Sequence, residues 1–494
     1  MPTAWYPTGV VATADKLFVA NAKGLGAGPN NGPGYPDPTS TTPRSPDQYI
    51  GSMMKGTLST VPLPLSADRL ATYTKTVRAN DGFDRPAPGT DGAPAIKHVV
   101  YVVQENRTFD QVFGSLGKGD GDKSLNLFGQ ESAPNQRQLQ RKFVTLDNFY
   151  ANAEISAQGW NWSVSANSNP YAEAMWPANY SGRRGTYPSE TDNPAVVGNR
   201  TLQDAYIWQR LQQRGVSFRN YGFYVNADAD GKMAGTDPVL DDHTDHDYLG
   251  FDMACPDNPD TFAPRRADCG TPRFTEWKRE FDGYVRNRNL PSLEFVRLPN
   301  DHTSGTKPGL PTPRAYVADN DLALGRLVDA VSHSRYWKDT AIFVTEDDAQ
   351  NGPDHVDAHR TISQVISPYT QHGRTDSTFY STASMLRTIE NIVGVAPMTQ
   401  FDTFATPMTA AFSSTPRGSA YDVIRPEQAG GATNARNAPM AAVSARQQLG
   451  VEDAIDERLF NMAIWESVKG RHSTMPAPEH RLPSSGGEGD GDDE

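Results

Sequence analysis

Residues 96–114 read IKHVVYVVQENRTFDQVFG, and this stretch predicts a strand that leads into a candidate ligand site. The apolar run from His98 to Val103 is too short for a helix core and is rich in β-branched residues. Such a run is typical of a strand buried on both faces of a parallel sheet. The polar residues that follow would lie at the carboxyl end of the strand, where ligands bind in open α/β sheets. The carboxylate of Glu105 and the amide of Asn106 are therefore candidate cation ligands.

Strands and helices alternate through the region that follows, and this alternation predicts the fold class. Further strands are expected at residues 216–224, 292–298, 340–344 and 364–367. Amphipathic helices are expected at residues 201–214, 316–334 and 379–393. Gly215 and Gly394 directly follow two of these helices, as glycine commonly does at a helix C-terminus. The alternation indicates an α/β protein with a mainly parallel central sheet and helices on both faces.

The N-terminal segment predicts a small β element and a connector. Residues 1–22 predict a β-hairpin that resembles a blade piece of a YVTN-type β-propeller. Because propeller repeats need neighbours to bury their faces, the pair is either part of a larger propeller or a hairpin added to the main domain. Residues 23–95 are rich in Gly, Pro, Ser and Thr and predict an extended connector. Within this connector, a strand is expected at residues 55–65 and a helix at residues 66–80.

The remaining boundaries follow from where the periodicity begins and ends. The main domain, expected to be catalytic, spans residues 96–400. Residues 401–481 lose periodicity, so they are expected to wrap this domain and to end in a helix at 453–468 packed against it. The tail at 482–494, LPSSGGEGDGDDE, is acidic and rich in glycine, and it predicts disorder.

Charge and cysteine content restrict the class of protein. The 494 residues carry a formal net charge of −13, which disfavours nucleic-acid binding and suits a protein that binds cations. The chain has no apolar run of about 18 residues, so no transmembrane helix is expected. Cys255 and Cys269 favour a local disulfide in an oxidising compartment, with two unpaired thiols as the alternative. We therefore expect a periplasmic or secreted protein whose signal peptide, if it has one, is not part of this chain, since residues 1–11 lack a basic segment and a long apolar segment.

Three predicted strands end in acidic or metal-binding residues, and these ends predict a metal site. The pairs are Glu105-Asn106, Asp301-His302 and Asp347-Asp348, and the last pair is followed by His355 and His359. Carboxylates that meet at one sheet edge repel each other unless cations neutralise them. Mixed Asp and His ligands suit zinc, manganese or iron better than magnesium or calcium alone. A single acidic pair is more often a solvated turn, but three such pairs favour a metal site.

A nucleophile is expected close to this edge. Ser156 lies in AEISAQGWNW, residues 153–162, where a strand-like entry turns into a predicted helix. A serine at that position can cap the helix, which is its common structural role, or direct its hydroxyl towards the sheet edge. Ser163, further along the same helix, is the competing candidate.

These motifs resemble the phosphoesterase family of phospholipases C and acid phosphatases, within the alkaline-phosphatase-like superfamily. The resemblance is carried by QENRTFDQVFG, SAQGWNW and FVTEDDAQNGPDHVDAH, and it spans residues 96–400. It places the metal-binding Glu and Asn on Glu105 and Asn106, and a later acidic pair on Asp347 and Asp348. The nucleophile falls on Ser156, although this segment departs from the Gly-Pro-Ser/Thr form of the family.

The resemblance implies an enzyme that hydrolyses phosphate esters through a serine nucleophile and a phosphoseryl intermediate. It implies one or more divalent metal ions, with zinc or manganese favoured over iron or calcium, and a small-molecule or lipid phosphate ester as substrate. The implied catalytic set is Ser156, Asn106, His302 and His355. The implied metal ligands are Glu105, Asn106, Ser156, Asp301, Asp347, Asp348, His355 and His359.

Two other functions compete with this interpretation. A non-catalytic surface or binding protein could use the propeller-like segment as its interaction module, but every acidic position of the motifs is filled. A sulfatase on the same fold would need the Cys-x-Pro/Ala-x-Arg sequence around its nucleophile, which this chain lacks. Phosphate ester hydrolysis is therefore the favoured prediction.

Overall fold

A computed structural model of the chain describes residues 1–24, 54, 56–80, 96–168, 170–179, 206–264, 266–349, 352–417, 420–449 and 455–474. The expected tail at 482–494 lies outside these residues, as do the first residues of the helix expected at 201–214. Among the described residues, no helix is long and apolar enough to cross a membrane.

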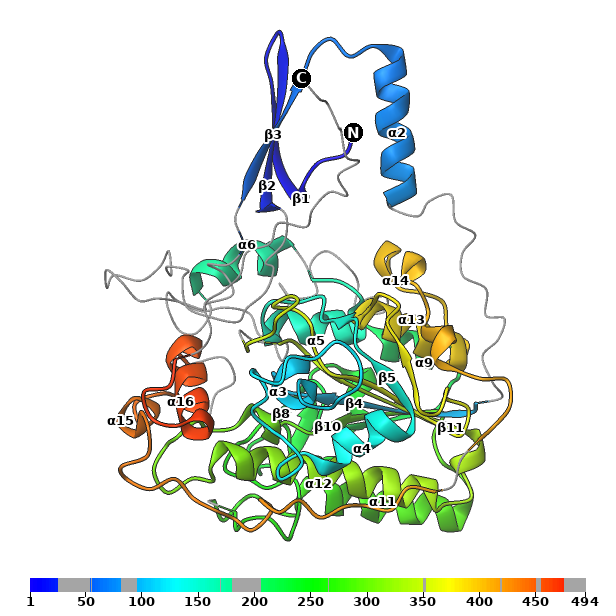
Figure 1. The fold of residues 1–494 in the computed structure, drawn as a ribbon. Helices are drawn as coiled ribbons and strands as arrows, with labels where there is room; N and C mark the ends of the chain where they lie inside the picture. Colours follow the sequence, from blue (N-terminus) through cyan, green and yellow to red (C-terminus); the bar gives the residue numbers. More distant parts are fainter. Residues whose placement is uncertain are drawn as a thin grey trace.

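A five-stranded sheet forms the centre of the main body (Figure 1). Its strand order is β12 (Ser363–Ile366), β11 (Thr340–Glu346), β4 (His98–Gln104), β10 (Leu293–Arg297) and β7 (Phe218–Tyr221). The pairs β11·β4, β4·β10 and β10·β7 are parallel, and only β12 on the edge runs antiparallel. The predicted mainly parallel α/β sheet is therefore confirmed, with β4 at its centre.

Helices cover both faces of this sheet. On one face lie α5 (Ser156–Ser165), α9 (Ile207–Arg214) and α13 (Thr382–Val393); on the other lie α11 (Arg273–Asn287) and α12 (Pro313–Ser332). Alternate residues of β4 serve the two cores, because successive strand side chains point to opposite faces. Val99 and Tyr101 pack in the core that contains Trp160 of α5, whereas Val100 and Val102 pack in the core that contains Leu327 of α12.

Shorter elements complete the body. In chain order they are α3 (Phe109–Phe113), α4 (Pro134–Lys142), β5 (Val144–Leu146), β6 (Phe149–Tyr150), α6 (Pro170–Asn179), β8 (Val225–Ala227), β9 (Met233–Gly235), α10 (Pro238–Asp241), the 3-10 helices η2 (Asn300–His302) and η3 (Trp337–Asp339), β13 (Arg374–Asp376), β14 (Tyr380–Ser381), α14 (Gln400–Phe404), η4 (Met408–Ala411), α15 (Ala441–Ser444) and α16 (Glu457–Lys469). The final helix, α16, packs with Phe460 and Ile464 in a core that also contains Val112 of α3.

The N-terminal segment forms a separate sheet of three strands above the main body in Figure 1. β1 (Trp5–Ala12) and β2 (Lys16–Gly24) form the predicted hairpin, and β3 (Thr57–Pro62) pairs with β2 on its other side. The expected hairpin is confirmed, and the strand expected inside the connector adds a third strand to the same sheet. Helix α2 (Ala67–Asn80) follows and begins where Ser66 Oγ accepts from Arg69 N.

Candidate active site

Three neighbouring strand ends converge at the carboxyl edge of the sheet. Glu105 and Asn106 follow β4, η2 with Asp301 and His302 follows β10, and Glu346 closes β11 just before Asp347 and Asp348. β4 lies between β10 and β11, so the three ends are adjacent. The N–H of Glu105 donates to Asp301 Oδ1 at 3.1 Å, and the N–H of Asp347 donates to the Gln104 carbonyl at 3.1 Å. The predicted acidic ends therefore lie together.

The backbone turns sharply at two of these strand ends. Asn106 has φ 67° and Thr303, which follows His302, has φ 68°. Residues other than glycine rarely adopt this left-handed conformation, and each instance costs about 1–3 kcal/mol. Asparagine tolerates it best among them, which is a local reason for an Asn at position 106. Strained backbone of this kind is common at functional sites, and here it occurs at the strand ends that carry the candidate ligands.

Ser156 lies at the first turn of α5 and faces the acidic edge. Its Oγ is 2.9 Å from Asp348 Oδ2 and 3.3 Å from Asn106 Oδ1, and the residue is fully buried. A hydroxyl carries one hydrogen, so the two oxygens are alternative acceptors. The residue before it, Ile155, occupies the N-cap position, where no side chain caps the helix. Ser156 thus combines a polarised hydroxyl with the positive end of a helix dipole.

A glycine allows α5 to approach β11 this closely. A Cβ built on Gly159 would lie 2.3 Å from the Asp347 carbonyl oxygen and 2.6 Å from its carbonyl carbon. No other residue fits between the second turn of α5 and this backbone without displacing one of them. Gly159 therefore fixes the distance between Ser156 and Asp348.

Two buried arginines accompany the carboxylates. Arg297 at the end of β10 donates through Nε to Glu105 Oε1 at 3.0 Å, and its guanidinium also stacks over the Trp160 ring. Arg107 donates to the backbone carbonyls of Asp301 and His302, at 2.8 and 2.7 Å. The hydrogen bonds of Arg107 therefore hold η2 in place. Glu105 forms a buried ion pair with Arg297.

The pKa values of the Asp301 and Glu346 carboxyl groups are raised. Burial raises the pKa of Asp301 to about 7, with Arg107 opposing the rise. Burial, followed by the charge of Asp301, raises the pKa of Glu346 well above its usual value. Both oxygens of Glu346 and Oδ2 of Asp301 are buried without a hydrogen-bond donor among the described residues. Buried acceptors without donors are the atoms that a cation would satisfy.

His302 presents a third atom of this kind. Its Nδ1 lies 3.0 Å from the Thr303 carbonyl oxygen, which can only accept, so Nδ1 carries the hydrogen. Burial lowers the pKa of His302 to about 4, so the ring is neutral and Nε2 has a lone pair. Nε2 is buried and has no hydrogen-bond partner among the described residues. A carbonyl that fixes the tautomer in this way is a common arrangement behind a metal-binding histidine. Among the described residues, three groups of acidic and histidine side chains lie close enough together to hold one cation: Asp110, Asp354 and His355; Asp329, His333 and Asp422; and Asp245, Asp247 and Glu276. Asp301, His302 and Glu346 do not form such a group, so a metal site at this edge stays a prediction.

The structure places His355 and His359 in separate charged clusters. His355 Nδ1 is 2.6 Å from Asp110 Oδ2, and this hydrogen bond raises the pKa of His355 to about 9. His359 Nδ1 is 2.8 Å from Asp357 Oδ1, and its Nε2 is 3.5 Å from Glu154. Burial lowers the pKa of His359, but Asp357 and Glu154 outweigh it and raise the pKa to about 10. His355 with Asp110 and Asp354 is one of the groups of described residues that could hold a cation, so its predicted metal role stays a prediction. His359 lies between Asp357 and Glu154.

Two site residues were not predicted from the sequence. The expected strand ends at residue 344, and the motif that covers this strand end assigns a metal role to the acidic pair Asp347-Asp348. Glu346, which lies between the expected strand and this pair, was therefore not predicted as a site residue. Arg297 is the second-last residue of the predicted strand SLEFVRL, which also contains Glu294, so a charge in this strand did not distinguish Arg297 as a site residue. Each is the last residue of its strand in the structure, so more accurate strand boundaries could have identified both.

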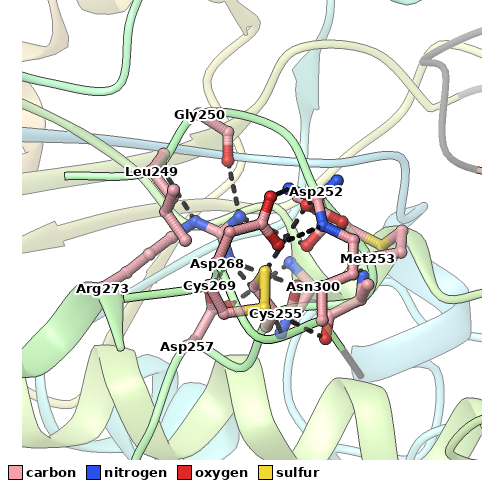
Figure 2. The surroundings of a disulfide bond; sticks show 12 residues. Leu249, Gly250, Asp252, Met253, Cys255, Asp257, Asp268, Cys269, Arg273 and Asn300 are labelled. Carbon is pink, nitrogen blue, oxygen red and sulfur yellow. Dashed lines mark hydrogen bonds and ion pairs between the residues drawn. A yellow bond between two sulfur atoms is a disulfide. The ribbon is translucent and has the colours of Figure 1, made fainter. Parts of the chain in front are cut away.

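The segment around the Cys255–Cys269 disulfide, here called the disulfide-bonded lobe, packs against η2 (Figure 2). Cys255 and Cys269 are joined by a disulfide, and the Cys255 carbonyl accepts from Asn300 Nδ2 at 3.1 Å. Arg273 is fully buried and lies 2.9 Å from Asp257 Oδ1, whose other oxygen accepts from the Asn300 N–H at 3.3 Å. The lobe therefore holds the residue that directly precedes Asp301.

The chain was compared with known protein families and with solved structures. The sequence model of the Phosphoesterase family matches residues 117–396, a span that contains Ser156, Asp301 and Asp348 and begins after Asn106. None of the curated proteins matches the chain.

Several solved structures match the chain at low sequence identity. A protein in the alkaline phosphatase superfamily from Vibrio parahaemolyticus is 20% identical, with a TM-score of 0.43, over 67% of this chain and 77% of that chain. The lipoteichoic acid synthase LtaP from Listeria monocytogenes is 13% identical, with a TM-score of 0.41, over 67% of this chain and 81% of that one. The phosphonate monoester hydrolase of Agrobacterium radiobacter is 13% identical, with a TM-score of 0.38, over 61% and 74% of the two chains.

Proposed function

This chain belongs to the phosphoesterase family, and we propose that it hydrolyses phosphate esters with Ser156 as the nucleophile. Family membership supports an ester hydrolase in general, and one observation supports the finer proposal. The Ser156 hydroxyl lies 2.9 Å from Asp348 Oδ2, at the first turn of a helix and at the edge where three acidic strand ends meet. This contact supports Ser156 as the proposed nucleophile and Asp348 as the proposed acceptor of its proton.

Asp301 and Glu346, whose buried carboxyl groups interact with each other, are the proposed core of the metal site, and His302 is a further proposed ligand. Asn106, Asp347 and Asp348 would complete it, with Glu105 reached through Oε2, the oxygen not directed at Arg297. When bound, a divalent cation such as zinc or manganese would polarise the phosphoryl group and favour the ionised form of the serine hydroxyl. This set contains neither His355 nor His359.

The residues of the chain then divide the reaction into two displacements. In the first, Ser156 Oγ attacks phosphorus, its proton passes to Asp348, and the bond from phosphorus to the leaving oxygen breaks. Asp348 returns that proton to the departing alkoxide, which leaves as an alcohol, and a phosphoseryl group remains. In the second, a water molecule attacks the phosphoseryl group, which releases inorganic phosphate and restores the hydroxyl. The N-terminal end of α5 would stabilise the phosphoryl oxygens throughout.

An ester panel with metal analysis tests this function. The substrates are an aryl phosphate, a bis-aryl phosphate and phosphatidylcholine, which separate a phosphatase from a phosphodiesterase or a phospholipase C. We expect bound divalent metal, activity that a chelator removes and zinc or manganese restores, and a loss of at least about 10³-fold in Ser156→Ala. Asp347→Asn should lose both metal and activity.

Ser163→Ala is the matched control, because Ser163 is also a buried serine of α5. It should keep near wild-type turnover. Full activity in Ser156→Ala with loss in Ser163→Ala would move the nucleophile. Absence of metal and of turnover on every ester would favour a non-catalytic binding protein instead.

A further inference from the structure

A lysine on the buried face of β2 reaches from the N-terminal sheet into the main body. Val19, Asn21 and Lys23 share one face of β2, because alternate residues of a strand point the same way. Val19 and Asn21 are buried, and the Lys23 side chain keeps only 21% of its surface exposed. A charged group on such a face requires partners of opposite charge.

The partners of Lys23 are two glutamates from the main body. Lys23 Nζ lies 2.7 Å from Glu154 Oε1 and 3.2 Å from Glu173 Oε2, and the two glutamate side chains are 3% and 6% exposed. On its other side, the Tyr6 ring of β1 lies 5.3 Å from Nζ. Tyr6 has φ 56° at an irregularity in the β1·β2 pairing, which places it beside Lys23. Lys23 and Tyr6, which lie side by side here, both belong to the N-terminal sheet.

These glutamates belong to a ring of hydrogen bonds around the start of α5. The N–H of Glu154 donates to Gln158 Oε1 at 3.1 Å, and Gln158 Nε2 donates to Glu173 Oε1 at 2.7 Å. Lys23 closes this ring by joining the two glutamates. The ring encloses the turn at residues 154–158, which contains Ser156. The position of the serine therefore depends on a residue that lies far away in the sequence.

We infer that Lys23 is a positioning residue for the nucleophile, and that the N-terminal sheet is a working part of the active site. The inference rests on the proposed role of Ser156. Without the ammonium group, Glu154 would keep His359 as a cationic partner, whereas Glu173 would lose its ion pair with Lys23. The repulsion between the two buried carboxylates would then move Glu173 on α6 away from Glu154 on the turn. Ser156 would then lose its alignment with Asp348, while the groups that bind the substrate would stay in place.

The test compares Lys23→Met and Lys23→Arg in the full chain, with Lys16→Met as the matched control. Lys16 begins the same strand and is exposed. We expect kcat for aryl phosphate to fall at least about 10-fold in Lys23→Met with KM within about 2-fold, and Lys23→Arg to recover most of the loss. Glu173→Gln, which weakens the same ring from α6, should lower kcat in the same direction.

Hydrogen–deuterium exchange of the peptide 151–165 provides a readout that needs no turnover. Exchange should rise in Lys23→Met and stay at the wild-type level in Lys16→Met. Wild-type kcat and wild-type exchange in Lys23→Met would overturn the inference. If no variant, including the wild type, hydrolyses any ester, the proposed function fails, and the exchange result still decides whether Lys23 holds the turn.

Discussion

Glu346 offers a prediction at the scale of a single residue. Its carboxyl oxygens are buried beside Asp301 without a donor, so the metal-free protein holds an acid in an unfavourable place. The amide introduced by Glu346→Gln can donate to Asp301, which should raise the unfolding free energy of chelator-treated protein by on the order of 1 kcal/mol. The same change should lower metal affinity and reduce hydrolysis at least about 10²-fold.

Chemical denaturation with and without chelator, together with metal titration, measures both effects. Glu427→Gln, at an exposed position, serves as the control and should change neither. A variant that is less stable without metal, or that keeps full metal affinity, would show that Glu346 is a structural acid.

Individual site residues could be predicted where the chemistry is local. Glu105, Asn106, Asp301 and Asp348 follow strands whose apolar patterns are plain in the sequence. His355 and His359 could not be assigned in the same way, because one partner of each, Asp110 and Glu154, lies about two hundred or more positions away, although His359 also contacts the nearby Asp357. A histidine beside an Asp in the sequence gives no indication of which carboxylate it meets in the fold.

At the scale of an element, the packing of α5 on β11 predicts a sharp effect at Gly159. In Gly159→Ala, the methyl group would meet the Asp347 backbone at 2.3 Å, so α5 must move away from the strand end. A shift of about 1 Å at Ser156 should lower kcat on the order of 10²-fold. Steady-state kinetics with aryl phosphate measure the effect.

Gly283→Ala in the middle of α11 is the matched control. A Cβ there meets only the Arg286 side chain, at 3.9 Å. Because alanine favours a helix, this variant should keep full activity and gain about 0.5–1 kcal/mol in unfolding free energy. Equal kinetics in the two variants would contradict the proposed closeness of α5 and β11.

Elements with strong apolar periodicity were predicted, and those buried by polar contacts were not. The strands of the central sheet, α12 and α13 lie within a few residues of their expected positions. Helix α4, PNQRQLQRK, is mostly polar and was not predicted. It is buried because Asp321 of α12 accepts from the N–H groups of Asn135 and Gln136, a contact between distant segments. Such burial depends on tertiary structure, which a local pattern does not record.

At the scale of the whole molecule, a buried acid in the central sheet predicts how stability changes with pH. Burial raises the pKa of Glu294 on β10 to about 8, from an ordinary value of 4.5. Between these values the folded protein keeps a proton that the unfolded chain has released, so the unfolding free energy falls as the pH rises through this window. A shift of this size corresponds to roughly 5 kcal/mol over the full window.

Glu294→Gln removes this titration. Its unfolding free energy should therefore fall less than that of the wild type between about pH 5 and about pH 8, and it should exceed the wild-type value at the upper end. Thermal or chemical unfolding at several pH values measures the difference, with exposed Glu427→Gln as the control. Parallel pH profiles for Glu294→Gln and the wild type would show that Glu294 ionises normally in the folded protein.

The overall class of the molecule was predicted, but its N-terminal organisation was not. The α/β fold and the phosphoesterase family are confirmed, because both depend on strand patterns and motifs that lie in single stretches of the chain. The resemblance of residues 1–22 to a propeller blade stays a prediction. The strand expected at residues 55–65 is confirmed as β3, but its pairing with β2 and the contact of Lys23 with Glu154 join segments that the sequence separates, so neither contact was predicted.

The central claim is that a phosphoryl group passes through Ser156, and trapping that intermediate tests it most directly. The protein, loaded with metal, is mixed with excess aryl phosphate, quenched in acid during turnover and digested, and each peptide is weighed. We predict that one phosphoryl group is found on Ser156 in the wild type and none in Ser156→Ala. Turnover without any phosphopeptide, or with the phosphoryl group on another residue, would contradict the account.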